Sequence, residues 1–285
     1  MDPAGPQQTK DPAEPKGRTG RNLPAAIGVG VVLGGLVFLT LLTVKATFLA
    51  YMGIAVGIAV AELTSALAKR DINIPWIPVA AGGVAMVACA YWLGSRYALA
   101  AMGLTVIAIA AWRLTGGASG YVKDTTAGVF AAAYLPLMAT FVAAMLVPAD
   151  GPRRVLTFII VTICSDIGGY FAGITVGRHP MAPAISPKKT WEGFAGSAVA
   201  CVAAGTLCVR FLLHGHPWQG VLIGAAVVLA ATVGDLVESM IKRDLDIKDM
   251  GTVLPGHGGI LERLDSLLIA APVVWLLLYL FIPAG

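Results

Sequence analysis

Carboxylates stand inside or at the ends of apolar stretches in the second half of the sequence. Asp166 lies within one long apolar run, Asp235 lies toward the end of another, and Glu262 and Asp265 open a third. A carboxylate deep in a membrane helix costs about 2.5–3.5 kcal/mol, so acids at such positions indicate function. Acids that converge from several helices beside basic loops can hold Mg²⁺ against a nucleoside triphosphate, because phosphate oxygens and water complete the coordination of the ion. This pattern predicts phosphoryl or nucleotidyl transfer.

A basic segment, ISPKKTWEG at residues 185–193, opens another apolar run. Its Ser186, Lys188, Lys189 and Thr190 would form an anion site at a helix N-terminus, because hydroxyls, ammonium groups, free backbone N–H groups and the helix dipole all favour phosphate. A positive membrane anchor with a Ser or Thr cap would also explain these charges. It explains the following Trp-Glu-Gly less naturally, so we favour a phosphate site.

Two further polar clusters follow along the chain. Asp235, Glu238, Ser239 and Lys242 stand at helical offsets of three, four and seven, so one stripe presents two acids, a hydroxyl and a base. An ion pair between Glu238 and Lys242 would be purely structural, but it leaves Asp235 unexplained. The next loop lacks EF-hand spacing. Its PGHGG stretch lets backbone amides approach a ligand closely, with His257 as a donor among them.

Small residues accompany the first of the acids. Asp166 shares one helical stripe with Tyr170, Gly173 and Gly177. Gly169, Gly173 and Gly177 also recur every four residues, the spacing that lets two membrane helices approach closely. Packing within one chain explains these glycines, and a homodimer through the same face is the open alternative.

The elements that must position these residues are apolar helices. Hydrophobic residues make up 57% of the 285 residues, charged residues make up 13%, and the mean hydropathy is +0.80. A soluble globular protein is less apolar than this. All four cysteines lie inside apolar runs without paired spacing or a nearby His cluster, so we interpret them as small buried hydrophobes.

The apolar runs predict an all-α fold, a polytopic integral membrane protein with about nine transmembrane helices, since one span needs about 20 apolar residues. The expected spans are 24–43, 46–67, 75–94, 97–115, 126–147, 155–177, 193–213, 219–241 and 264–283. Residues 1–22 are rich in Pro, Gly and charge, and we expect a disordered cytoplasmic tail there. Residues 23–285 are expected to form a single membrane domain, with the catalytic half at about 155–285.

The Lys and Arg residues favour one orientation in the membrane. With a cytoplasmic N-terminus, fifteen of the 20 Lys and Arg residues fall on the inner side and five on the outer side, as the positive-inside rule requires. The adjacent Arg153 and Arg154 on the outer side are mildly discordant. We therefore expect a multi-pass protein of the inner (plasma) membrane, with its N-terminus and its active site facing the cytoplasm.

The stretch from Ser239 through Asp265 resembles the phosphatidate cytidylyltransferases, or CDP-diacylglycerol synthases. It carries SMIKR, KD, PGHGG and ERLD in this order, and the upstream SPKKTWEG is similar to the same family. The matching stretches cover about residues 160–270, and the N-terminal half resembles the family only in being hydrophobic. One departure is Glu262, because the family pattern usually has Asp at this position, which is linked to metal binding.

The resemblance implies transfer of CMP from CTP to phosphatidate, which releases pyrophosphate and leaves CDP-diacylglycerol in the membrane for phospholipid synthesis. It also implies a divalent metal, which we expect to be Mg²⁺, as one ion or two. The residue chemistry agrees. The second pKa of a phosphate monoester is about 6, so the attacking oxygen needs no strong base. We expect CTP, phosphatidate and membrane lipid as partners, and no nucleic acid.

We expect the following roles for the site residues. The catalytic residues are Asp235, Asp265, Lys242 and Lys188. The metal is held by Asp235, Glu262 and Asp265, together with Asp166. The substrates are bound by Ser186, Lys188, Lys189, Thr190, Lys242, Arg243, Lys248 and Arg263, and by the loop residues Gly256, His257, Gly258 and Gly259.

Two other classes of function remain open. In a transporter or channel, Asp166, Asp235 and Asp265 would line a path for protons or cations, but their clustering toward the cytoplasmic side argues against this. A CTP-using membrane kinase that acts on a polyprenol or diacylglycerol would need a hydroxyl acceptor and an activating base. The long signature argues against the kinase.

Overall fold

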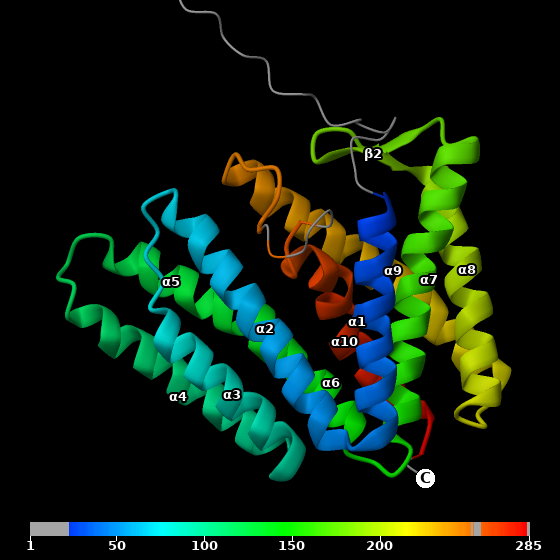
Figure 1. Ribbon diagram of the computed structural model, residues 1–285, viewed down its shortest axis with the longest axis horizontal. Coiled ribbons are helices and arrows are strands. Elements are labelled where there is room, and N and C mark those ends of the chain that lie inside the picture. Colours follow the sequence, from blue (N-terminus) through cyan, green and yellow to red (C-terminus); the bar gives the residue numbers. More distant parts are fainter. Residues whose placement is uncertain (1–22, 252, 254–257, 284–285) are drawn as a thin grey trace, which may run out of the picture.

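The computed structural model describes residues 23–251, 253 and 258–283, and these residues form a bundle of helices (Figure 1). In chain order the elements are α1 (Leu23–Thr43), α2 (Lys45–Ala68), α3 (Trp76–Trp92), α4 (Ser95–Leu114), α5 (Tyr121–Ala132), the π-helical turn η1 (Ala133–Leu137), α6 (Met138–Leu146), α7 (Gly151–Val176), β1 (Pro180–Ala182), β2 (Ser186–Thr190), α8 (Trp191–Phe211), α9 (Pro217–Asp244) and α10 (Leu261–Phe281). The predicted tail at 1–22 lies outside the described residues.

Within the described residues, seven helical segments are long and apolar enough to cross a membrane. They are α2, α4, the continuous segment from α5 through α6, α7, α8, α9 and α10. Two shorter apolar helices, α3 and the Gly30–Thr43 part of α1, accompany them. Exposed large hydrophobic residues such as Val84 and Tyr279 cover the outside of the helices, as expected of a surface that faces lipid. The prediction of an all-α membrane protein is confirmed, and its number of about nine spans is approximate.

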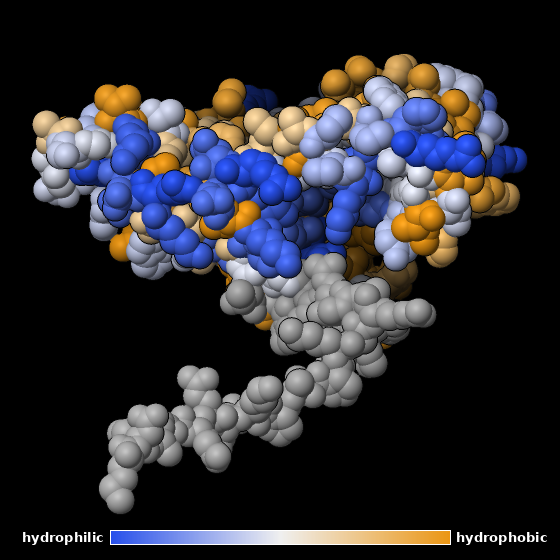
Figure 2. Space-filling view, turned by 90° about the horizontal axis from the view of Figure 1, so that it is seen from above, coloured by the Kyte–Doolittle hydropathy of each residue, from blue (hydrophilic) through white to orange (hydrophobic). Residues whose placement is uncertain are grey.

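The connections between helices gather at two opposite ends of the bundle (Figure 1). The hairpin end carries β1, β2 and the connections 69–75, 115–120 and 245–251. Contacts tie these connections together, because Arg70 Nε donates to the carbonyl oxygen of Leu245 at 3.0 Å and the Asn73 N–H donates to Asp124 at 2.9 Å. Figure 2, which views this end, shows hydrophilic residues gathered across it.

At the opposite end of the bundle, Arg154 connects the start of α7 to the end of α10. It is one of the two arginines that do not follow the positive-inside rule. Its side chain is buried, pairs with Asp150 at 2.8 Å and donates to the carbonyl oxygens of Ile282 and Pro283 at 3.0 and 2.9 Å. These carbonyls follow the last turn of α10, where intrahelical partners run out. Arg154 therefore closes the end of α10, a structural role that explains its presence on this side.

Helices α7, α8, α9 and α10 pack against one another in chain order, and α10 also contacts α2 and α6. The glycines of α7 lie at the first of these interfaces. A Cβ at Gly169 would come within 2.5 Å of Ser197 Oγ, and Cβ atoms at Gly173 and Gly177 would lie 3.7 and 2.9 Å from Oγ1 of Thr190, the N-cap residue of α8. The glycine face therefore packs within one chain against α8, which is the first of the two explanations that the sequence left open.

The helical segment that begins with α5 is interrupted by a wider turn. Pro136 lies in η1 and has no N–H to donate, so the regular hydrogen-bond ladder gives way to a π-helical turn. Helix α3 packs closely on this turn, since a Cβ at Gly83 would lie 3.0 Å from Pro136. The turn belongs to the core, and its Tyr134 is only 5% exposed.

The basic segment forms a strand and only partly the expected helix N-terminus. Residues Ser186–Thr190 make β2, which pairs antiparallel with β1. Only Thr190 caps α8, through acceptance of the Gly193 N–H at 3.1 Å. Pro187 helps to explain the strand, because proline disfavours helical geometry in the residue before it.

The close helix contacts give a test of the fold. Alanine at Gly224 would place its Cβ about 2.4 Å from the Cys201 carbonyl oxygen and near other backbone atoms of α8. We expect Gly224→Ala to lower the free energy of unfolding by about 1–3 kcal/mol, as overpacking does. Thermal unfolding in detergent measures this. Gly53→Ala is the matched control, since nothing lies within 4 Å of a Cβ there; equal stability of the two variants would contradict the packing of α8 on α9.

Candidate active site

A cavity of about 420 Å³ opens between four helices and the hairpin, near the hairpin end. Its lining includes the site residues Asp166 from α7, Lys188, Lys189 and Thr190 from β2, Asp235 from α9, and Glu262, Arg263 and Asp265 from α10, together with Gly169, Tyr170 and Gly173. The structure thus gathers eight of the predicted residues from separate parts of the chain into one place.

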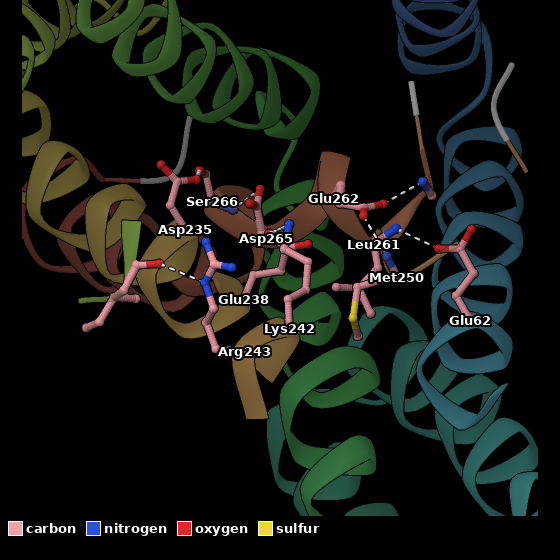
Figure 3. A network of polar contacts seen from close by, with 12 residues as sticks. Glu62, Asp235, Glu238, Lys242, Arg243, Met250, Leu261, Glu262, Asp265 and Ser266 are labelled. Carbon is pink, nitrogen blue, oxygen red and sulfur yellow. Dashed lines mark hydrogen bonds and ion pairs between the residues drawn. The ribbon is translucent and has the colours of Figure 1, made fainter. Parts of the chain in front are cut away.

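The aspartates of the cavity are held by specific partners. Asp235 forms a close ion pair with Lys189 Nζ and accepts a hydrogen bond from Ser266 Oγ at 2.6 Å. The backbone N–H of Ser266 donates to Asp265 at 2.7 Å, so Ser266 links the two aspartates (Figure 3). Asp166 lies within electrostatic reach of Asp235, Lys189 and Arg263. The three acids therefore share one electrostatic environment in which Lys189 supplies a compensating charge.

A second pocket of about 430 Å³ lies beside the hairpin at the end of α9. It is lined by Ser186, Ser239, Lys242, Arg243 and Lys248, with Ile185, Asp246 and Ile247. Three basic side chains and two hydroxyls give it the chemistry of a phosphate site. Strand β2 contributes to both hollows, because Ser186 lines this pocket and Lys188 lines the acidic cavity.

Two basic side chains of the second pocket, Lys242 and Arg243, are held by contacts with other residues. Lys242 Nζ pairs with Glu238, which is 3% exposed, at 2.8 Å. Arg243 Nε donates to the carbonyl oxygen of Ile185 at 3.4 Å and so ties the hairpin to α9 (Figure 3). The predicted ion pair of Glu238 and Lys242 exists, and it lies at the wall of a polar pocket.

Glu262 occupies both of its carboxylate oxygens with backbone groups. It accepts the Met250 N–H at 2.7 Å and the Gly259 N–H, and thereby closes the loop before α10 (Figure 3). It also lines the cavity. Its role as a metal ligand stays a prediction, and the contacts show a structural role that the sequence motif did not indicate.

Glu62 of α2 reaches the same loop from the N-terminal half. Its carboxylate is 6% exposed and accepts the backbone N–H groups of Ile260 and Leu261 at 3.1 and 2.9 Å (Figure 3). These are donors at the start of α10 that have no intrahelical partner. No sequence motif assigns Glu62 a role. Its signal was present, because it is the one acid inside the first five predicted spans.

The Trp-Glu-Gly that follows the basic segment also has a structural explanation. Glu192 accepts the N–H groups of Arg178 and His179 at 3.1 and 3.2 Å and contacts the His179 ring at 2.5 Å, which closes the base of the hairpin. Gly193 lets α8 approach α7, since a Cβ there would lie 3.1 Å from the Gly169 carbonyl oxygen. Both residues therefore belong to the contacts that join the hairpin, α7 and α8.

Two predicted substrate-binding residues, Gly256 and His257, lie outside the described residues. Of their neighbours, Gly258 has a φ of +80°, a conformation that favours glycine. A Cβ at Gly259 would lie 2.5 Å from Glu62 and 2.7 Å from Glu262. These glycines are needed for the loop to pass between two glutamates.

The donor set of the cavity fits a hard divalent cation that shares its coordination with a ligand. Among the described residues, no group of three or more His, Cys, Asp or Glu side chains gathers closely enough to hold a metal by itself. Mg²⁺ does not need such a group, because it commonly takes one or two carboxylates and completes its coordination with phosphate oxygens and water. Asp235 and Asp265, joined through Ser266, can supply these carboxylates.

Comparison with known proteins extends over nearly the whole chain. Residues 24–281 match the Cytidylyltransferase family. A phosphatidate cytidylyltransferase of Mycobacterium leprae (strain TN) is 42% identical over 283 residues, which cover 92% of this chain and 89% of that protein. One from Brucella suis biovar 1 (strain 1330) is 32% identical over 263 residues, with 90% and 93% covered. The similarity therefore includes the N-terminal half, where the sequence motifs indicated only hydrophobicity.

The contacts of Glu62 give a test of the loop. In Glu62→Gln, the side-chain carbonyl can accept one backbone N–H, while the amide group faces the other donor. We expect the free energy of unfolding to fall by about 2 kcal/mol, and turnover to fall with it, because the loop leads into Glu262 and Asp265. Chemical unfolding and a turnover assay measure the two effects. Ser65→Ala, an exposed change on the same helix, is the control; wild-type stability and turnover in Glu62→Gln would contradict this role.

Proposed function

The chain belongs to the Cytidylyltransferase family and is a membrane nucleotidyltransferase, and we propose that its acidic cavity is where CMP passes from CTP to phosphatidate. The observation that carries this assignment is the meeting of Asp166, Asp235 and Asp265 with Lys188 and Lys189 in one cavity at the polar end of a membrane bundle. The products are CDP-diacylglycerol, which stays in lipid, and pyrophosphate, which leaves into water.

The reaction needs positioning and charge neutralisation more than it needs a base. A phosphate oxygen of phosphatidate attacks the α-phosphorus of CTP, a new P–O bond forms, and the bond from the α-phosphorus to the oxygen that bridges to the β-phosphate breaks. The attacking oxygen is already anionic near neutral pH, because the second pKa of a phosphate monoester is about 6. The protein's main task is to bring two anions together and to neutralise the charge of the departing pyrophosphate.

The two hollows suggest a division of the substrates between them. The pocket of Lys242, Arg243 and Lys248 lies at the polar end of α9, and we assign it the triphosphate of CTP. The acidic cavity is bordered by Tyr170, which is 66% exposed on α7. We assign this side to phosphatidate, with its phosphate at Lys188 and Thr190 and its acyl chains along the outside of α7.

We propose that Asp235 and Asp265, with Asp166 beside them, hold Mg²⁺ at the CTP phosphates. When bound, Mg²⁺ neutralises negative charge on the phosphate oxygens and orients them. Lys189 pairs with Asp235, so this ammonium group is held where it can turn to a phosphate oxygen once the carboxylate has another partner. Arg263, from the turn that bears Asp265, adds positive charge on the same side.

We place the hairpin end on the cytoplasmic side of the inner (plasma) membrane, with the N-terminus on the same side. The support is the charge distribution, since the basic residues Arg70, Lys188, Lys242 and Arg243 lie at this end and few lie at the other. CTP is a cytoplasmic nucleotide, so this orientation also brings it to the pocket.

A homodimer would need a face other than the glycines of α7, because these pack against α8.

The activity and the orientation can be tested together in sealed membrane vesicles that contain the protein. We expect inside-out vesicles given phosphatidate, Mg²⁺ and labelled CTP to form lipid-bound cytidine and pyrophosphate in equal amounts, and EDTA to abolish both. Right-side-out vesicles should gain this activity only after detergent. CDP without lipid-bound cytidine would indicate a kinase, and equal activity of the two vesicle types before detergent would contradict the orientation.

The site residues are tested by changes that remove their charge, and one of the two changes, Asp265→Asn, also keeps the size of the side chain. We expect Asp265→Asn and Lys188→Ala to lower kcat about 100-fold or more, the usual scale for loss of a preorganised charged contact, without loss of thermal stability. Asp71→Asn is the matched control, because Asp71 is exposed at the same end and Asn tolerates its φ of 57°. Normal turnover in either site variant would remove that residue from the mechanism.

A further inference from the structure

Tyr134 carries a buried hydroxyl that the mechanism above does not use. The residue is 5% exposed, and its hydroxyl oxygen lacks a hydrogen-bond partner among the residues that the structure describes. Its ring stacks on Phe130, with ring centroids 5.3 Å apart, and its backbone belongs to the π-helical turn η1. A buried hydroxyl normally finds a partner, because an unsatisfied one is costly. Such an atom in a π-helical turn indicates a site, since these turns occur frequently at functional positions.

A second unpaired atom of complementary chemistry lies in the same region. Glu238 is 3% exposed, and its Oε2 pairs with Lys242 at 2.8 Å. Its Oε1 is buried and has no partner in the described part of the chain. Tyr134 lies within electrostatic reach of Glu238 and of Asp235 and Asp265. A hydroxyl can donate and a carboxylate oxygen can accept, and one buried water between them would satisfy both.

Glu238 connects this buried pair to the second pocket. Lys242 stands one helical turn after Glu238 on α9 and lines the pocket that we assign to the CTP triphosphate. The position of the ammonium group therefore depends on the carboxylate beneath it. The other carboxylate oxygen of Glu238, Oε1, can be held by a group that reaches it from η1.

Resting on the function proposed above, we propose that Tyr134 is a positioning residue for nucleotide binding: through one buried water its hydroxyl holds Oε1 of Glu238, and Glu238 holds Lys242 at the pocket wall. The wide turn at Pro136 places Tyr134 for this contact. The N-terminal half thereby contributes to the CTP pocket, although none of the residues that the structure describes in that half line the pocket.

The test compares Tyr134→Phe with the wild-type enzyme. We expect the KM for CTP to rise about five- to tenfold, the scale of one hydrogen bond, with kcat within twofold, because an interaction equal in the ground state and the transition state affects KM alone. The protection that CTP gives against thermal unfolding should weaken by the same factor. This second measurement needs no turnover, so it tests Tyr134 even if wild-type vesicles form no CDP-diacylglycerol, which would overturn the proposed function instead.

A double-mutant cycle separates positioning from a general structural effect. Glu238→Gln should raise the same KM, and Tyr134→Phe in that background should change it less than twofold, since both changes act on one network. Tyr121→Phe is the matched control on the same helical segment, because its hydroxyl donates to Ala110 away from the site, and we expect its KM to stay at the wild-type value. An unchanged KM in Tyr134→Phe would overturn the proposal. It would also be overturned if the fold-changes in KM of the two single variants multiplied in the double variant, because the two residues would then act independently. If Tyr134→Phe fails to fold, an unchanged KM in Glu238→Gln alone would do so.

Discussion

Repulsion between carboxylates inside an apolar bundle is the constraint on which the arrangement of the site depends. Asp265 lies within electrostatic reach of Asp235, Glu238 and Asp166, and such a group is unfavourable away from water unless cations or donors compensate it. The compensating groups come from different elements: Lys189 from the hairpin, Lys242 from the end of α9 and Ser266 from α10. The acids are tolerable only where these elements meet, so the charge of the site and the packing of α7 to α10 are linked.

Three glutamates around this cluster differ in their contacts from Asp166 and Asp235. The aspartates Asp166 and Asp235 line the cavity on short side chains. The glutamates Glu62, Glu192 and Glu262 use their longer side chains to accept backbone N–H groups of loops and helix starts. Loops in a membrane protein need such acceptors, because unsatisfied backbone groups are expensive where water is scarce. The glutamates thus shape the frame within which the aspartates face their ligands.

Sequence reasoning succeeded where one residue or one helix carries the information. Hydropathy located the apolar helices within a few residues, and the cost of a buried charge singled out Asp166 and Asp235, which do share a cavity. It failed where distant residues meet. Glu62 contacts residues 198 and 199 positions away, and no periodicity records such a contact. The hairpin was missed because a basic segment before a helix resembles a helix start, and Tyr134 was missed because a tyrosine in an apolar run indicates only core.

The π-helical turn also constrains how this chain can change in length. A π turn contains one residue more than the α-helical turn it replaces, and each residue of an α-helix rotates the chain by about 100°. Deletion of a single residue after Tyr134 in this turn would let α5 and α6 join as one regular helix, but it would rotate Tyr134 and the side chains of α5 relative to α6. The number of residues in this segment is therefore fixed by the geometry of its neighbours, independently of which side chains it carries.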